Sequence, residues 1–86
     1  MAPKESISSN KAQIALMPVA YEDAHPGEHV DMTDPAEKRQ VVAAWLAEYA
    51  ALYRDFTDDH AGETVDLSND DAVHDLWERI KEETVH

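Results

Sequence analysis

The sequence predicts a small all-α domain built on two long amphipathic helices, over about residues 34–57 and 69–83, plus a short N-terminal helix or extended arm. Large apolar side chains recur at helical spacing in both segments, and residues that commonly cap helices precede each of them. The chain has 86 residues, which is enough for one domain. We therefore expect one hydrophobic core that both helices share.

The N-terminal part of the chain has the weakest pattern. Residues 1–11 show no hydrophobic periodicity and are expected to form a flexible terminus, which leaves 12–86 as a single small acidic helical domain. Residues 12–21 are apolar and fit either a short helix that ends at Pro18 or an extended arm, because proline disfavours a helical conformation in the residue before it. If this segment instead pairs with residues 64–67 as a strand, the domain becomes α+β with a minor hairpin.

The longer helix has a clear N-terminal signal. Asp34 is expected at the N-cap, Pro35 at the first helical position and Glu37 three residues after the cap, as in an Asp-x-x-Glu capping box. Large apolar residues then follow at helical spacing and form one stripe, made of Val42, Trp45, Leu46, Tyr49, Leu52, Tyr53 and Phe56. A stripe of this size, with alanines around it, also suits a homodimer formed through the 34–57 helix.

Two connectors flank this helix. Residues 22–33 contain Pro26-Gly27, a dipeptide typical of turns, and are expected to form a loop. Residues 61–67 follow the helix, and Gly62 is expected to adopt the positive φ that often ends one.

The second helix is expected to begin after Ser68, which is a favourable N-cap. Asp70 and Asp71 would stand in its first turn, and Leu67 is positioned for a hydrophobic staple. Its apolar face consists of Val73, Leu76, Trp77 and Ile80. We expect Trp77, like Trp45 of the longer helix, to lie in the core.

Acidity is the strongest compositional feature. The chain carries 19 Asp and Glu against 7 Lys and Arg, a net charge of −12, of which residues 63–86 contribute −6. Without a basic patch, direct binding to nucleic acid or to an anionic membrane is disfavoured, and a basic protein surface is the natural partner. Because there is no cysteine, no apolar run of a signal peptide and no stretch of ~20 apolar residues, we expect a cytoplasmic protein.

Four carboxylates of the second helix form a row opposite its apolar face: Asp71, Asp75, Glu78 and Glu82. At ~100° and ~1.5 Å per residue they fall within about 60° of one another and ~5–6 Å apart, close to the phosphate spacing of a nucleic-acid strand. Asp58 and Asp59 form a second acidic cluster. These six residues are the predicted partner-binding site. The plainer alternative is a solvated polar face, in which an Asp75–Arg79 pair weakens the row.

Catalysis and cofactor binding are not indicated. Paired carboxylates are everywhere in so acidic a chain, two glycines cannot form a phosphate-binding loop, and a helical domain of this size rarely encloses a pocket. The one metal candidate is the cluster of His25, Glu28, His29 and Asp31. Its spacing crosses the Pro-Gly turn rather than a helix face, so surface histidines explain it without a metal. We predict a protein that is not an enzyme and holds no cofactor or metal.

The leading hypothesis is an acidic protein-binding inhibitor or regulator that occupies a partner's basic, nucleic-acid-binding surface. Phage-encoded inhibitors of host nucleic-acid machinery, some of them nucleic-acid mimics, share these gross properties. The main alternative is an accessory subunit of a larger enzyme or assembly that docks through Ile14 and Leu16 in the apolar N-terminal segment. A third hypothesis makes the acidity an adaptation to high cytoplasmic salt, with no bearing on function.

Overall fold

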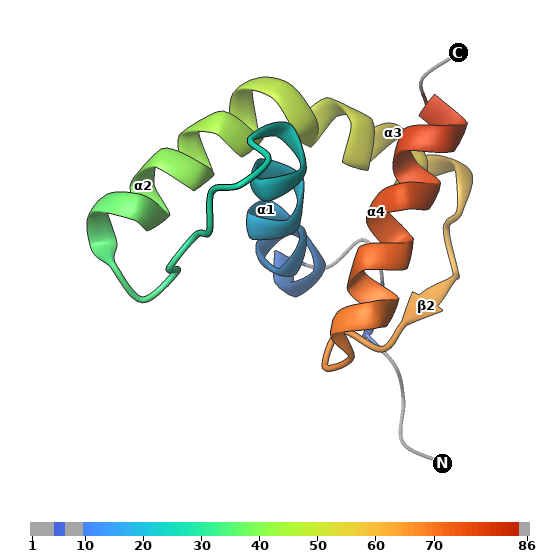
Figure 1. Ribbon diagram of the computed structural model, residues 1–86. Helices are drawn as coiled ribbons and strands as arrows, with labels where there is room; N and C mark the ends of the chain where they lie inside the picture. The colour runs from blue at the N-terminus through green and yellow to red at the C-terminus, as the bar shows by residue number, and fades with distance from the viewer. Residues whose placement is uncertain (1–4, 7–9, 85–86) are drawn as a thin grey trace.

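Helices dominate the part of the chain that the computed structural model describes, residues 5–6 and 10–84 (Figure 1). In chain order the elements are β1 (Glu5–Ser6), α1 (Asn10–Ala24), α2 (Pro35–Ala44), the π-helix η1 (Trp45–Tyr49), α3 (Ala50–Asp59), β2 (Thr64–Val65) and α4 (Asp70–Thr84). The predicted all-α class is confirmed. The two predicted amphipathic helices correspond to the α2–η1–α3 segment and to α4, and α1 is a third helix as long as α4.

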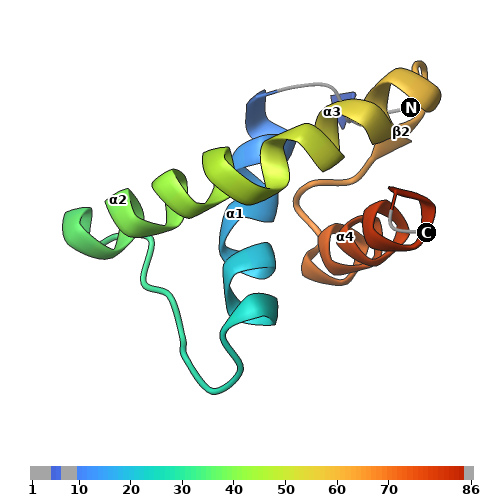
Figure 2. The same cartoon turned by 90° about the horizontal axis from the view of Figure 1, so that it is seen from above.

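The helices form two layers. α2, η1 and α3 follow one another without a break as a single rod, which lies across α1 and meets α4 at its α3 end (Figures 1 and 2). α1 also packs against α4. The smallest dimension of the molecule is 19 Å, about two helix diameters, so every helix keeps one face on the core and one toward solvent.

Aromatic side chains fill the place where the three helical units meet. The predicted core placement of Trp45 and Trp77 is confirmed, because both side chains are buried, and their rings lie 6.2 Å apart. Tyr49 meets Trp77 edge to face at 5.1 Å, the arrangement that aromatic pairs prefer. The largest fully buried side chains are Trp45, Trp77, Phe56, Leu16, Leu76, Ile80 and Val41.

The π-helix corrects the predicted apolar stripe of the longer helix. The Ala50 N–H donates to the Trp45 carbonyl, five residues back, so η1 contains one residue more than a regular turn. The extra residue shifts the register, and the buried apolar positions become Val41, Trp45, Ala50, Tyr53 and Phe56. Leu46, which was expected in the stripe, is 62% exposed, and Val41 takes the core position expected for Val42.

α1 corrects the prediction for the N-terminal segment. The helix continues through Pro18, where the sequence predicts its end, and no extended arm follows. Pro18 has no N–H to give to the Ile14 carbonyl, and an interior proline costs ~3 kcal/mol in a helix. Leu16 and Met17 directly before it are buried, and burial of such side chains contributes ~1.5–3 kcal/mol each, which offsets that cost. Tertiary packing therefore overrides the local signal.

β1 and β2 form an antiparallel pair of two residues each, with Glu5 opposite Val65 and Ser6 opposite Thr64. The α+β alternative, in which residues 64–67 pair with 12–21, is wrong because 12–21 lies inside α1. The pair takes up two residues of the segment 1–11 that is expected to be flexible. For residues 1–4 and 7–9 that prediction lies outside the described residues.

The predicted N-cap residue of α2 and the two glycine turns are confirmed, but the predicted N-cap of α4 is wrong. The capping box is incomplete among the described residues, because the Asp34 N–H donates to the Asp31 carbonyl rather than to Glu37. The Asp34 carboxylate accepts a hydrogen bond from the Ala36 N–H and caps α2. Gly27 and Gly62 adopt φ of 90° and 99°, which favour glycine in the turns after α1 and α3. α4 is capped by Asn69 rather than by Ser68, whose hydroxyl donates to Asp66 instead. Because Ser68 donates to Asp66 in this turn, it does not cap the helix, and α4 begins one residue later than predicted, at Asp70.

Candidate partner-binding surface

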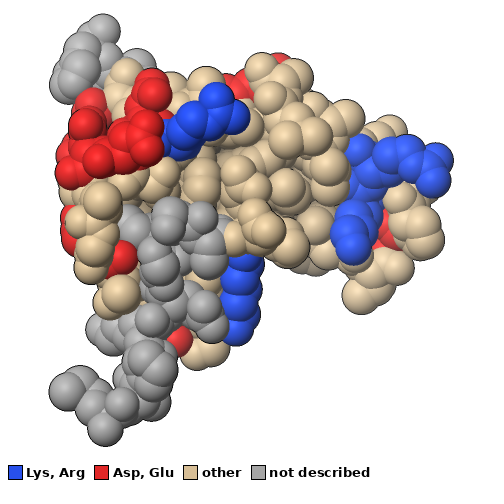
Figure 3. All heavy atoms as spheres, turned by 180° about the vertical axis from the view of Figure 1, so that it is seen from behind, with Lys and Arg blue, Asp and Glu red and all other residues tan. Residues whose placement is uncertain are grey.

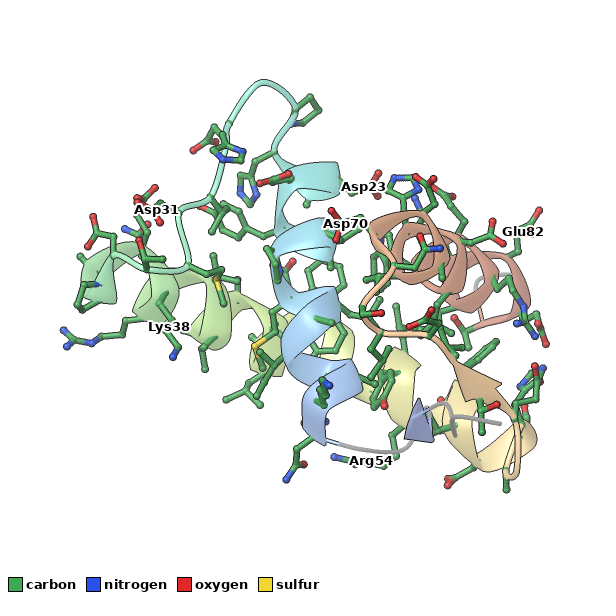
Figure 4. All side chains as sticks on the ribbon, turned by 90° about the horizontal axis from the view of Figure 1, so that it is seen from below. Asp23, Asp31, Lys38, Arg54, Asp70 and Glu82 are labelled. Carbon is green, nitrogen blue, oxygen red and sulfur yellow. The ribbon has the colours of Figure 1, made fainter. Side chains whose placement is uncertain are left out.

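α4 is held by its apolar face and presents its carboxylates on the other side. Val73, Leu76, Trp77 and Ile80 are buried against α1, α3 and the connector, as the sequence predicts. Asp71, Asp75 and Glu82 of the predicted row are exposed, and Glu78 is half-buried. Glu82 points away from α1 in Figure 4. The row rises ~16 Å along the helix axis at ~1.5 Å per residue.

Most of the row is not neutralised by neighbouring cations. Among the described residues none forms an ion pair with Asp71, Asp75 or Glu82. Glu78 is the exception, because its carboxylate lies 3.4 Å from the Lys81 ammonium. Three carboxylates of the four are therefore exposed to solvent without an ion-pair partner among the described residues.

Arg79 corrects the predicted pairing within α4. The sequence places it four residues after Asp75, but its guanidinium donates to both carboxylate oxygens of Glu63, at 3.0 and 3.3 Å, and lies over the Phe56 ring. Glu63 in the connector offers a contact that the guanidinium reaches while it covers apolar surface. The Asp75 carboxylate is left without the partner that was expected to weaken the row.

Asp23 is a neighbour of this surface that the sequence did not predict. Its carboxylate accepts from the Lys81 ammonium at 2.7 Å and from the Trp77 indole N–H at 3.3 Å, and it joins α1 to α4 (Figure 4). The Lys81 hydrogen bond holds the pKa of Asp23 below its usual range, against the opposing effect of burial, and Asp23 in turn raises the pKa of Lys81. These residues are more than 50 positions apart, so no local pattern could have found the contact.

Stability is expected to depend on Asp23 in one pH window. Because its folded pKa is lowered, its contribution is present above the unfolded pKa near 3.8 and is lost as the pH falls through the folded pKa. Lys81, whose folded pKa is raised, contributes below 10.5 and loses its contribution as the pH rises through the folded value. Asp23→Asn should lower the free energy of unfolding by about 1 kcal/mol at pH 7, since the pair is partly exposed.

Urea unfolding of wild type and Asp23→Asn at several pH values checks this. The difference between the two proteins should shrink below pH ~4 and above pH ~11. Glu28→Gln, at an exposed loop position, is the control and should change nothing. A difference that stays constant down to pH ~2 would rule out an ionised Asp23 as its source.

The second acidic cluster lies at the C-terminal end of the row. Asp58 and Asp59 end α3 beside the end of α4, where a hollow of about 330 Å³ is lined by Asp55, Asp58, Asp59, Glu83 and Thr84. His60 joins the two helix ends, with its Nε2 atom 2.9 Å from the Glu83 carboxylate. Figure 3 shows acidic side chains gathered where α3 and α4 end. The two predicted clusters thus follow one another along the same edge of the molecule.

The candidate metal ligands of the first loop contact separate neighbouring residues rather than one another. His25 stacks on Tyr21 and its Nδ1 contacts the Tyr21 carbonyl, while the Nδ1 of His29 lies 3.3 Å from Glu22. Asp31 accepts from the backbone and hydroxyl of Thr33, which lower the pKa of its carboxyl. Within residues 5–6 and 10–84, no three His, Asp or Glu side chains are arranged to hold a metal ion.

The apolar N-terminal segment that the accessory-subunit hypothesis uses lies in α1. Leu16 is fully buried in the core, whereas Ile14 is 55% exposed. None of the described helices combines the length and apolarity needed to cross a lipid bilayer.

Comparison of the chain with protein-family models, with curated proteins and with solved structures finds no match. What the acidic surface does has therefore to be inferred from its geometry and charge.

Proposed function

We propose that this chain is a small acidic inhibitor or regulator that occupies the basic, nucleic-acid-binding surface of a partner protein with the exposed face of α4. The observation that carries the proposal is the row of Asp71, Asp75 and Glu82, which no described cation neutralises on a helix fixed by its opposite face. A rigid helix holds the carboxylates at constant spacing, so little ordering entropy is lost on binding.

The charges beside the row favour the same function. Of the two basic residues of α4, Arg79 pairs with Glu63 outside the row, and Lys81 pairs with Asp23 of α1 and with Glu78 but with no other member of the row. Asp58 and Asp59 extend the acidic edge past the end of the helix. A net charge of −12 attracts a basic protein over a distance of about one Debye length and raises the rate of encounter. Occupation of such a surface excludes nucleic acid from it.

Reversing two charges of the row is expected to abolish capture of the partner. Asp75→Lys/Glu82→Lys removes two exposed carboxylates and opposes the partner's cations, so binding should weaken at least about 100-fold, on the order of 3 kcal/mol. The immobilised protein is incubated with lysate at low salt, and the retained proteins are identified by mass spectrometry.

The matched control is Glu28→Lys/Glu48→Lys, which changes two exposed carboxylates elsewhere and raises the net charge by the same amount. It should retain the partner, and both variants should keep the helicity of wild type. Equal loss of capture in both variants would mean that binding depends on the net charge of the protein and not on the position of the carboxylates. Retention by the row variant would exclude α4 as the binding surface.

A further inference from the structure

α2 and the start of η1 carry an apolar groove on the side away from the core. It has a volume of about 450 Å³ and is lined by Pro35, Lys38, Arg39, Val42, Ala43 and Leu46. The register shift at η1 explains it, because Leu46 would face the core in a regular helix and is here 62% exposed. Leu46 and Ile14 are the two large hydrophobic side chains left exposed among the described residues. The apolar surface of the groove thus extends over about three helical turns.

The charged residues that line this groove are basic, although the protein as a whole is acidic. Its lining includes Lys38 and Arg39 but no acidic residue. Arg79 and Lys81 are engaged by Glu63 and Asp23, whereas neither Lys38 nor Arg39 forms an ion pair with any described residue. Figure 3 shows Lys and Arg at the α2 end of the rear face with a small acidic patch beside them, while the larger group of acidic side chains lies at the opposite end. In Figure 4 the Lys38 side chain projects from α2 on the side of that face.

We propose that this groove binds an amphipathic helix of a partner protein that carries carboxylates beside its apolar face. Apolar side chains at i, i+3 or i+4, and i+7 would lie along Val42 and Leu46, as in other helix-in-groove complexes. The carboxylates would accept from Lys38 and from the Arg39 guanidinium, which suits two-point contact with a carboxylate. A basic helix would bind α4 instead, because the groove and the acidic row attract opposite charges. The groove proposal therefore does not rest on the proposed function.

The arrangement of charge favours this occupant over a second copy of the chain. A two-fold dimer through the groove would bring Lys38 and Arg39 of both copies together and would combine two net charges of −12. An acidic helix instead places opposite charges across each margin. The net charge of −12 disfavours binding of such a helix elsewhere on the surface.

NMR titration of the isotope-labelled full chain tests the proposal with a defined probe. The probe is a synthetic helical peptide with leucines at i, i+3 and i+7 and glutamates beside them, and its control has lysine in place of every glutamate. The glutamate peptide should shift the amide signals of residues 35–46 and leave those of 71–82 in place. Leu46→Glu, and separately Lys38→Glu/Arg39→Glu, should weaken its binding at least about tenfold, whereas Ile14→Glu should have no effect.

All four substituted positions are exposed, and circular dichroism confirms that each variant is folded. The proposal is overturned if the glutamate peptide leaves residues 35–46 unshifted, if the lysine peptide shifts them equally, or if the variants bind like wild type. Sedimentation equilibrium of the chain without peptide adds one more outcome. A dimer that Leu46→Glu dissociates would assign the groove to a second copy and would also overturn the proposal.

Discussion

Replacement of Trp77 by alanine is expected to unfold much of the protein at 37 °C. Trp77 is 1% exposed, packs against Trp45 and Tyr49, and donates its indole N–H to Asp23. Loss of a buried tryptophan costs ~3–5 kcal/mol, whereas the total stability of a domain is only ~5–15 kcal/mol and small domains lie at the low end. The side chain therefore supplies a large fraction of what holds α4 on α1 and the rod.

Thermal unfolding followed by circular dichroism measures this effect. At ~4–8 °C per kcal/mol for a domain of this size, Trp77→Ala should lower the Tm by more than about 12 °C and weaken the near-ultraviolet signal. Trp77→Phe keeps an aromatic ring and loses the hydrogen bond to Asp23, so its Tm should lie between those of wild type and Trp77→Ala. A Tm for Trp77→Ala within a few degrees of wild type would mean that α4 is not held through this side chain.

Deletion of single alanines is expected to distinguish the π-helix from the regular helix beside it. Without Ala47 the step from Trp45 to Ala50 becomes four residues, as in an α-helix, and both keep their core positions. Deletion of Ala43 instead shortens the four-residue step between Val41 and Trp45 and brings a polar residue to the buried Val41 position. That change should cost about 2 kcal/mol or more, whereas loss of Ala47 should cost little.

The two deletions are closely matched, because each removes one exposed alanine from the same rod and yields the same composition. Urea unfolding gives the free energy of unfolding for both variants and, from the m-value, the surface exposed. Equal destabilisation by the two deletions would show that the register of the rod is not set by η1.

Local sequence signals identified two of the three helical units and the start of the longer one. Asp34, Gly27 and Gly62 were predictable because a cap or a turn depends on the residue itself and its immediate neighbours. The apolar face of α4 was predictable because it follows one unbroken helical period over 15 residues.

What the sequence did not predict depends on contacts between distant segments. The π-helix inserts one residue where the rod crosses α1 and α4, and a periodicity argument assumes a constant 3.6 residues per turn. α1 persists through Pro18 because the segments on both sides of it are buried. Arg79 forms its ion pair with Glu63 rather than with Asp75, and Asp23 of α1 pairs with Lys81 of α4. The acidic row itself was predictable, but the lack of ion-pair partners for Asp71, Asp75 and Glu82 among the described residues was not.

Competition with nucleic acid tests the proposed function most directly. The protein captured by the immobilised chain is challenged with duplex DNA at low salt and, separately, with sodium chloride up to about 1 M, where the Debye length falls to ~3 Å. If α4 occupies a nucleic-acid-binding surface, both DNA and salt should release the captured protein, and the Asp75→Lys/Glu82→Lys variant should never retain it. A partner that stays bound in the presence of DNA and at high salt would contradict the proposal that the acidic face of α4 takes the place of nucleic acid.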